Sequence, residues 1–364
     1  MHWILSWFDR LLHEREGRDF QLSGKWFLLS ILLGMLVGIS TVVFDLTISF
    51  ISAVVLDGVV GAHLGETAGD YNRFRGWIDL GIPFHPVMFL LVITAGGLIS
   101  GFLMERYAPE AIGSGMGLAI QAFHEKRGHL RWQTIWVKQI TTAVTLGTGG
   151  SGGREGPIAQ IGAALGAWLS QKLHLTTRDR RILLAAGIGA GVGAMFRAPL
   201  AGALFAAEIL YREADFEAEV VVPAAMASII SYGVHSLFLP EAIRYTPLFG
   251  KELQFNFLTP FELIPYTLLA IALIVVGMLY TTLFARISKL FNQMRIPVTW
   301  RVGLGAFLSG LCAIGLLNSF QSWQQDLGSI GTGYGALQSV LTGKEQKTIG
   351  LLLAIVLGKI LSSS

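Results

Sequence analysis

The chain has 364 residues, of which 52% are hydrophobic and only 14% charged, whereas about 25% of residues are charged in an average soluble domain. The net charge of +3, the 44 glycines and the single cysteine exclude a disordered segment, a disulfide scaffold and a nucleic-acid-binding protein. A soluble chain of this length needs more charge to cover its surface, so the composition indicates a multi-pass protein of the cell membrane.

The first 22 residues carry apolar side chains at helical spacing from Trp3 to Leu12, followed by a charged stretch at 14–19. This pattern predicts an amphipathic helix over residues 1–22 that lies in the membrane interface, with an ordinary tail as the alternative. The remaining residues, 23–364, are predicted to form one transmembrane domain.

Two classes of uncharged run follow. Five runs are long enough for the roughly 20 residues that a spanning helix needs: 26–44, 86–104, 220–240, 263–285 and 302–325. Five shorter runs, rich in glycine, alanine and proline, lie at 139–153, 156–171, 182–196, 198–207 and 348–358. In a membrane protein, short segments of this kind predict broken or half-length helices, which are typical of transporters and channels.

The charges of two loops predict their sides of the membrane. Between residues 286 and 301 every charged side chain is basic, which places that loop in the cytoplasm under the positive-inside rule. The stretch 56–85 has an excess of acidic residues and is predicted to be external. The basic loop 172–181 stays unassigned, because helices of half length do not cross the membrane fully and the number of crossings before this loop cannot be counted.

A short pattern occurs twice. Gly-Ser-Gly-Met-Gly-Leu at 113–118 is matched by Gly-Thr-Gly-Tyr-Gly-Ala at 331–336, 218 residues later (331 − 113). The stretch that begins at Lys138 is matched by the one at Lys359, 221 residues later (359 − 138). The nearly equal offsets predict a duplicated transporter architecture, with chance similarity between glycine-rich stretches as the alternative.

The densest motif lies at 147–157 and reads Gly-Thr-Gly-Gly-Ser-Gly-Gly-Arg-Glu-Gly-Pro. Glycines let backbone N–H groups converge on one point, and Pro157 suits the first turn of a helix that continues through Ile158. The N-terminus of such a helix offers free N–H donors and the positive end of its dipole, which favour a bound anion. A glycine hinge at a helix start is the alternative.

Glu155 stands at the same predicted helix start. Its carboxylate would compete with a bound anion for the N–H donors, and protonation would end that competition, so we predict a gate that also carries a proton. A capping glutamate at the water interface is the alternative. The neighbouring Arg154 is interpreted as a residue that holds the loop in place.

A second anion site is predicted at Gly113, Ser114 and Gly115, where a hydroxyl precedes another helix start. Taken alone, serine beside glycine is more typical of an ordinary helix N-cap.

Three motifs together resemble one family. The 113–115 motif follows Ala-Pro-Glu-Ala at 108–111, the second reads Gly153-Arg154-Glu155-Gly156-Pro157, and the third is Arg-Ala-Pro-Leu-Ala-Gly at 197–202. Their order and spacing are similar to those of the CLC chloride channels and chloride/proton antiporters over essentially the whole chain.

The resemblance implies an all-α membrane protein, a CLC-like inverted-repeat bundle with full-length and broken or half-length helices. It implies a homodimer with one anion pathway in each subunit, in which Ser114 coordinates the central chloride and Glu155 is the external gate. The expected anion-binding set is Gly113, Ser114, Gly115, Gly156 and Ile158, with Gly153, Arg154 and Pro157 as motif support. No metal is expected, and no cofactor beyond chloride as the bound substrate ion.

The chain departs from the family pattern at three places. Gly117 stands where the family usually has proline, and Ile209, directly after Glu208, stands where antiporters commonly carry an inner proton-transfer glutamate. The second-half G-x-F-x-P element and the site tyrosine are missing, so we expect an incomplete chain whose second half is truncated at residue 364.

The sequence therefore predicts chloride or small-anion transport gated by Glu155, in the form of a chloride/proton antiporter. A passive voltage- or pH-gated chloride channel is the alternative, because Ile209 cannot titrate. A membrane-embedded enzyme with Glu155 as base is a remote alternative, since the apolar runs hold no partnered acid, nucleophile or metal cluster. Membrane lipid and a second copy of the chain are the expected partners, and serine at 114 implies chloride over fluoride by the resemblance.

Overall fold

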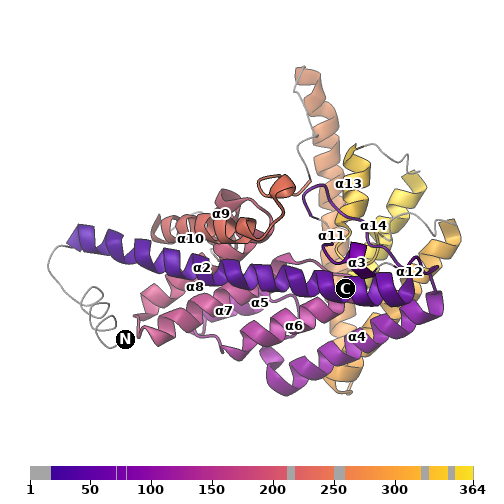
Figure 1. Cartoon of the computed structure of the whole chain (residues 1–364), viewed down its shortest axis with the longest axis horizontal. Helices are drawn as coiled ribbons and strands as arrows, with labels where there is room; N and C mark the ends of the chain where they lie inside the picture. The colour runs from indigo at the N-terminus through magenta and orange to yellow at the C-terminus, as the bar shows by residue number, and fades with distance from the viewer. Residues whose placement is uncertain are drawn as a thin grey trace. The chain divides into compact units, whose positions relative to one another are not determined.

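The computed structural model describes residues 18–70, 72–78, 80–210, 218–249, 259–320, 328–342 and 349–363. Within these ranges the chain is largely helical, and its only strand-like pairing is an isolated bridge between Thr67 and Asp70 (Figure 1). The helical segments are α2 (Arg18–Ser52), η1 (Ala53–Val60), α3 (Arg75–Ile78), α4 (Pro86–Tyr107), η2 (Pro109–Ala111), α5 (Met116–His124), α6 (Gln133–Gly147), α7 (Glu155–Lys172), α8 (Thr177–Met195), α9 (Pro199–Leu210), α10 (Ala218–Leu237), η3 (Glu241–Ile243), η4 (Pro260–Glu262), α11 (Leu263–Gln293), α12 (Val298–Phe320), α13 (Tyr334–Thr342) and α14 (Ile349–Ser363).

Five helical segments of the described chain are long and apolar enough to cross a membrane: Gly24–Val60, Pro86–Tyr107, Glu219–Leu237, Pro260–Gln293 and Val298–Asn318. They correspond to the five long runs of the sequence, which confirms the prediction of a helical multi-pass membrane protein. The interfacial helix predicted over 1–22 falls mainly on residues 1–17, outside the described residues. The boundary at residue 23 stays a prediction, and residues 18–22 belong to α2.

The short runs also form helices, with two corrections. The run 139–153 is helical only as far as Gly147, where α6 ends, because the consecutive glycines that follow favour irregular backbone. Helices α7 and α8 have 18 and 19 residues, so at about 1.5 Å per residue they are longer than half-length. Both helices are longer than the uncharged runs 156–171 and 182–196, because α7 extends to Lys172 and α8 begins at Thr177, in the charged connection between the two runs.

The described chain divides into two compact units. The first comprises the described residues of 1–44, 110–139 and 155–245, and the second those of 45–109, 140–154 and 246–364. Helices α5, α7, α8, α9 and α10 therefore belong to the first unit, and α4, α11, α12, α13 and α14 to the second.

The first unit is built around α8, which packs against α7, α9 and α10 and is buried from Ile182 to Met195. Glycines let these helices touch backbone to backbone, since a Cβ added to Gly187 would lie 2.1 Å from the carbonyl oxygen of Gly162. Close approach through small residues is how helices pack in lipid.

In the second unit α4 packs against α12, and α14 contacts both α11 and α12. The α4–α12 contact again depends on glycine, because a Cβ on Gly97 would lie 2.5 Å from the Cβ of Ala306. Helix α11 has no buried residue, and its exposed apolar surface suits contact with lipid.

Candidate anion-binding site

Helix α7 begins where the glycine-rich motif predicted a helix start. Glu155 is its first residue, and Pro157 and Ile158 follow in the first turn, both buried. The N–H groups of a first turn have no partner within their own helix. The structure thus confirms a helix N-terminus at Glu155, with N–H donors available beside it.

The Ser114 loop precedes α5. Gly113 and Gly115 have φ angles of +87° and +90°, a region that residues with a Cβ rarely adopt. The loop therefore needs glycine on both sides of Ser114. The side chain of Ser114 is exposed, and its hydroxyl makes no hydrogen bond to any residue that the structure describes.

These two motifs, 40 residues apart in the chain, meet within the first unit. A Cβ added to Gly156 would lie 2.1 Å from the carbonyl oxygen of Ser114, and one added to Gly115 would lie 3.0 Å from the carbonyl oxygen of Gly156. No side chain fits between them. The structure therefore places the Ser114 loop against the first turn of α7, which contains Glu155, Gly156 and Ile158.

Two buried side chains that the sequence did not assign to the site support the Ser114 loop. Lys138 is 4% exposed, and its Nζ donates to the carbonyl oxygens of Ala111 at 3.0 Å and Gly113 at 2.6 Å. Gln160 is fully buried, and its Nε2 donates to the carbonyl oxygen of Glu110 at 3.2 Å. The ammonium group of Lys138 fixes the loop and adds a positive charge beside it, which favours an anion.

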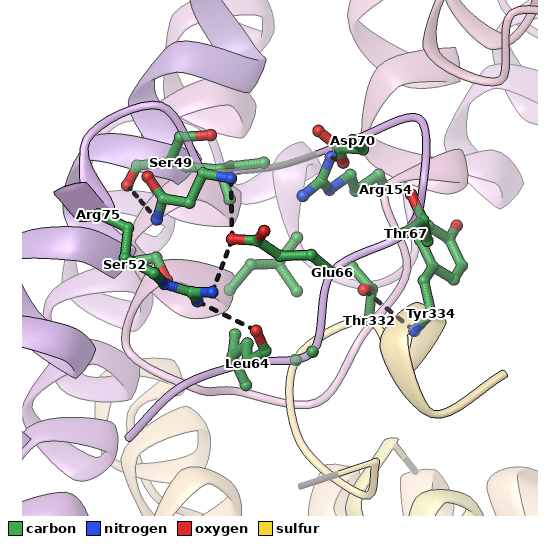
Figure 2. Close-up of a pocket in the computed structure, with 15 residues that line it drawn as sticks. Ser49, Ser52, Leu64, Glu66, Thr67, Asp70, Arg75, Arg154, Thr332 and Tyr334 are labelled. Carbon is green, nitrogen blue, oxygen red and sulfur yellow. Dashed lines mark hydrogen bonds and ion pairs between the residues drawn. The ribbon is translucent and has the colours of Figure 1, made fainter. Parts of the chain in front are cut away.

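Arg154 holds a loop, as the sequence suggested. In the second unit its Nη1 lies 2.8 Å from Oδ2 of Asp70 and 3.2 Å from Oδ1 of Asp45, and its side chain is 15% exposed. Figure 2 shows Arg154 beside Asp70 at the edge of a cavity of about 70 Å³. Neither carboxylate could be predicted from the sequence as a partner of Arg154, because both lie far from Arg154 in the chain.

The same cavity holds a second network of charges. Arg75 lies 2.7 Å from Oε1 of Glu66, as Figure 2 shows, and 3.3 Å from Oδ2 of the fully buried Asp57. Asp57 also pairs with Nδ1 of His63 at 2.8 Å. Each arginine therefore faces two carboxylates, so the lining is not electropositive and does not favour an anion.

The second unit contains a copy of the loop–helix arrangement. Gly331 and Gly333 have φ angles of +58° and +77°, and α13 begins at the next residue with nine residues, as many as α5. The Nζ of Lys359 donates to the carbonyl oxygen of Gly331, as that of Lys138 does to Gly113. The matching geometry supports the predicted repeat.

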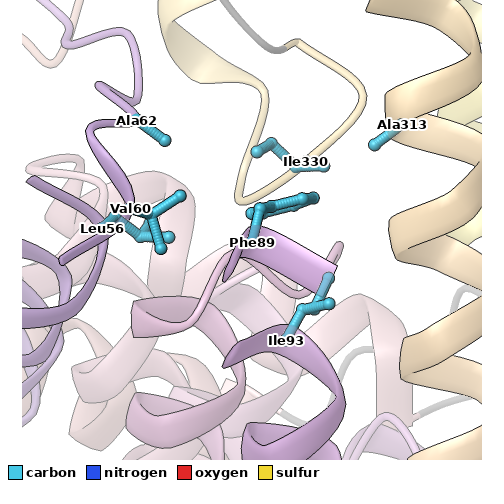
Figure 3. Close-up of a cluster of buried hydrophobic side chains, with 7 residues drawn as sticks. All are labelled: Leu56, Val60, Ala62, Phe89, Ile93, Ala313 and Ile330. Carbon is cyan, nitrogen blue, oxygen red and sulfur yellow. The ribbon is translucent and has the colours of Figure 1, made fainter. Parts of the chain in front are cut away.

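A hydrophobic cluster anchors this second loop. Ile330, directly before Gly331, is buried in a cluster shown in Figure 3 whose members are Leu56, Val60, Ala62, Phe89, Ile93, Ala313 and Ile330. The loop is also paired to the glycine-rich motif, because the N–H of Gly152 donates to the carbonyl oxygen of Gly331 at 3.1 Å.

A comparison with known proteins identifies the family of the chain. The profile of the family described as "Voltage gated chloride channel" matches residues 96–364. The H(+)/Cl(-) exchange transporter ClcA of Yersinia pestis bv. Antiqua (strain Angola) is 28% identical over 326 residues, which cover 85% of this chain and 64% of the relative. ClcA of Cronobacter sakazakii is 28% identical over 342 residues, covering 92% of this chain and 66% of the relative. The chain thus spans less than two thirds of the length of these relatives.

Two solved structures have a similar fold. A slow cyanobacterial Cl⁻/H⁺ antiporter matches with a TM-score of 0.69 at 19% identity, over 93% of this chain and 73% of the other. A CLC-type fluoride/proton antiporter matches with a TM-score of 0.68 at 23% identity, over 95% of this chain and 76% of the other. At these identities the likeness establishes the fold.

Proposed function

Because the chain belongs to the CLC family of voltage-gated chloride channels, we propose that it moves chloride across the membrane in exchange for protons. The observation that carries the proposal is the contact within the first unit between the Ser114 loop and the start of α7, where a Cβ on Gly156 would lie 2.1 Å from the carbonyl oxygen of Ser114. The names of the ClcA relatives support the same function.

The anion is held mainly by neutral donors. The first N–H groups of α7, including those of Gly156 and Ile158, and the hydroxyl of Ser114 replace the water that a chloride ion loses. Lys138 contributes positive charge from behind the loop, where its Nζ is bonded to the carbonyl oxygens of Ala111 and Gly113. A site without direct contact to a cation binds the ion weakly enough to release it.

Glu155 is the gate in this proposal. As the first residue of α7, its carboxylate is an anion placed at the same N–H donors that chloride uses. In the ionised state it competes with chloride, and in the protonated state it leaves the donors to chloride. The carboxylate and chloride thus occupy the N–H donors alternately. This alternation couples the movement of chloride in one direction to the movement of protons in the other.

A passive chloride channel remains the second candidate, and Ile209 is the observation that favours it. Ile209 lies next to the last residue of α9, at the position where the family resemblance leads us to expect an inner proton-transfer glutamate. A side chain that cannot titrate cannot relay protons there. Proton coupling therefore requires another inner route, for which the exposed Glu208 is the nearest acidic group in the chain.

The test is the reversal potential of the chain reconstituted in liposomes with chloride and pH gradients. Exchange predicts a reversal potential that moves with the pH gradient, and a channel predicts one that follows chloride alone. In Glu155→Gln, the neutral side chain mimics the protonated gate, so we expect chloride flux that no longer responds to external pH and carries no protons. Wild-type coupling in this variant would exclude Glu155 as the gate.

We further propose that two copies of the chain associate through α9 and α10. Leu200 and Leu204 on α9 and Val222 on α10 are more than half exposed, and both helices are rich in small residues that permit close packing in lipid. Cysteines placed at Leu204 and Val222 should crosslink two copies in liposomes. Absence of any crosslink under dilution in lipid would contradict this assignment.

A further inference from the structure

The first unit contains a large cavity that takes no part in the anion site. Its volume is about 900 Å³, and it is lined by the connection from α5 to α6, the end of α7 and the connection from α7 to α8. The volume is several times that of a chloride ion with its water, so the cavity suits a larger ligand.

The charges around this cavity are predominantly positive. Lys126, Arg131 and Lys172 line it, and the ammonium groups of Lys126 and Lys172 make no hydrogen bond or ion pair with any described residue. Arg131 lies 3.3 Å from the carboxylate of Glu110, the one acidic residue of the lining. One carboxylate against three cations leaves an excess of positive charge.

A fourth cation stands behind the lining. Arg180 donates to Nε2 of His129, and His129 lines the cavity. Burial, followed by the charge of Arg180, lowers the pKa of His129, so the ring is neutral at pH 7 and accepts this hydrogen bond. The positive charge of Arg180 therefore stays close to the cavity.

The remaining lining is apolar and aromatic. Trp132 is 53% exposed and Trp168 is half-buried, and both line the cavity with Leu118 and Leu130. Tryptophan is enriched where a membrane protein meets the lipid headgroups, because its ring is amphipathic. The cavity is thus suited to a ligand with an anionic part and an apolar part.

The cavity also lies close to the start of the first membrane-spanning segment. The Nζ of Lys25 lies 2.8 Å from Oδ2 of Asp179, in the first turn of α8. Lys25 is the second residue of the first membrane-spanning segment, Gly24–Val60. The α7–α8 connection, which contributes His174 to the cavity, therefore stands beside the point where this segment begins.

From these observations we propose that the cavity binds the headgroup of an anionic phospholipid. The phosphate lies among Lys126, Arg131 and Lys172, where charge-assisted hydrogen bonds are strongest, and the glycerol and the first methylene groups lie on Trp132 and Trp168. Basic pockets of a membrane protein are typical binding places for anionic headgroups.

The test compares lipid binding by the detergent-purified wild-type chain and two double variants. Lys126→Gln with Lys172→Gln removes two charges from the cavity. The matched control, Lys289→Gln with Arg295→Gln, removes two exposed charges that do not line it. Native mass spectrometry measures the retention of phosphatidylglycerol and of phosphatidylcholine, whose headgroup carries no net charge. Size-exclusion chromatography verifies that each variant is folded.

We expect phosphatidylglycerol to bind the wild type and the control alike, and the cavity variant roughly 10- to 30-fold more weakly. Phosphatidylcholine should bind all three proteins equally weakly. Equal phosphatidylglycerol binding by both double variants would overturn the proposal. Inorganic phosphate, added as a competitor at millimolar concentration, should not displace the lipid. Binding of phosphate without any preference for phosphatidylglycerol would also overturn it, because the ligand would then be a free anion.

Discussion

The two units contain the same loop–helix arrangement but use its hydroxyl differently. In the first unit the hydroxyl of Ser114 is exposed and makes no hydrogen bond to any described residue. In the second unit Oγ1 of Thr332 accepts a hydrogen bond of 3.5 Å from the N–H of Tyr334, so the hydroxyl caps its own helix. Both loops have two glycines with positive φ and a lysine that donates to the first glycine's carbonyl oxygen.

This difference distinguishes the residues that support each loop from the residues that bind the anion. The glycines and the lysine build a helix start in each unit, and in the first unit a second helix start lies against the loop, through the close contact of Gly156 with Ser114. In the second unit a Cβ on Gly335 would lie 2.2 Å from the carbonyl carbon of Gly65, so irregular backbone packs against the start of α13. We infer that the anion binds at the first loop.

The largest effect is expected from Gly156→Ala. The added Cβ would lie 2.1 Å from the carbonyl oxygen of Ser114, so the two motifs must separate, and the strain costs about 1–3 kcal/mol. Chloride flux into liposomes should fall to background. Gly117→Ala is the matched control, because a Cβ there meets nothing within 4 Å. A Gly156→Ala variant with wild-type flux would contradict the close approach of the two motifs.

The two lysines allow a direct comparison of the copies. Lys138→Met removes two charge-assisted hydrogen bonds, each worth about 1.5–3 kcal/mol, together with the positive charge behind the Ser114 loop. We expect chloride affinity, measured by isothermal titration calorimetry, to fall by roughly tenfold or more. Lys359→Met should lower the thermal stability but leave chloride affinity unchanged. Equal losses of affinity in both variants would place an anion at both loops.

Variants of Arg154 and Asp70 test whether their ion pairs stabilise the glycine-rich motif. Arg154→Gln leaves the carboxylates of Asp45 and Asp70 close together without their shared cation, and since these groups are only partly exposed we expect a loss of about 2 kcal/mol in unfolding free energy. Asp70→Asn should cost less, because Arg154 keeps Asp45 as a partner. Thermal unfolding in detergent measures both variants, and the reverse order would contradict the geometry.

The smallest effect is expected from the hydroxyl groups. Ser114→Ala removes one neutral donor to the anion, so chloride affinity should fall by roughly 2- to 10-fold, equivalent to about 0.5–1.5 kcal/mol. Thr332→Ala removes a helix cap and should change stability alone. Chloride titrations measure the affinity of both variants. A larger loss of affinity in Thr332→Ala than in Ser114→Ala would place the anion at the second loop and contradict its assignment to the first.

Patterns within one element of the chain were predictable from the sequence. The long apolar runs predicted the five spanning segments, and the start of α7 at Glu155 followed from the glycines and Pro157. These features are local, because hydropathy and backbone preference depend on neighbouring residues. The run 139–153 is helical only as far as Gly147, where the glycine-rich motif begins.

The supporting contacts could not be predicted in the same way. Lys138 donates to a loop 25 residues before it, and Arg154 pairs with a carboxylate 109 residues before it. Such pairs depend on how the helices pack. The one available signal was a lone charged or amide side chain inside an apolar helix, such as Lys138 or Gln160. A group of this kind must find a partner when it is buried.

The central claim is that the anion lies between the Ser114 loop and the first turn of α7. A crystal structure with bromide in place of chloride tests it most directly, because the anomalous signal of bromide locates the ion. We predict a bromide peak within hydrogen-bonding distance of the Ser114 hydroxyl and the N–H of Ile158, and none at the hydroxyl of Thr332. A peak at the second loop, or none at the first, would contradict the account.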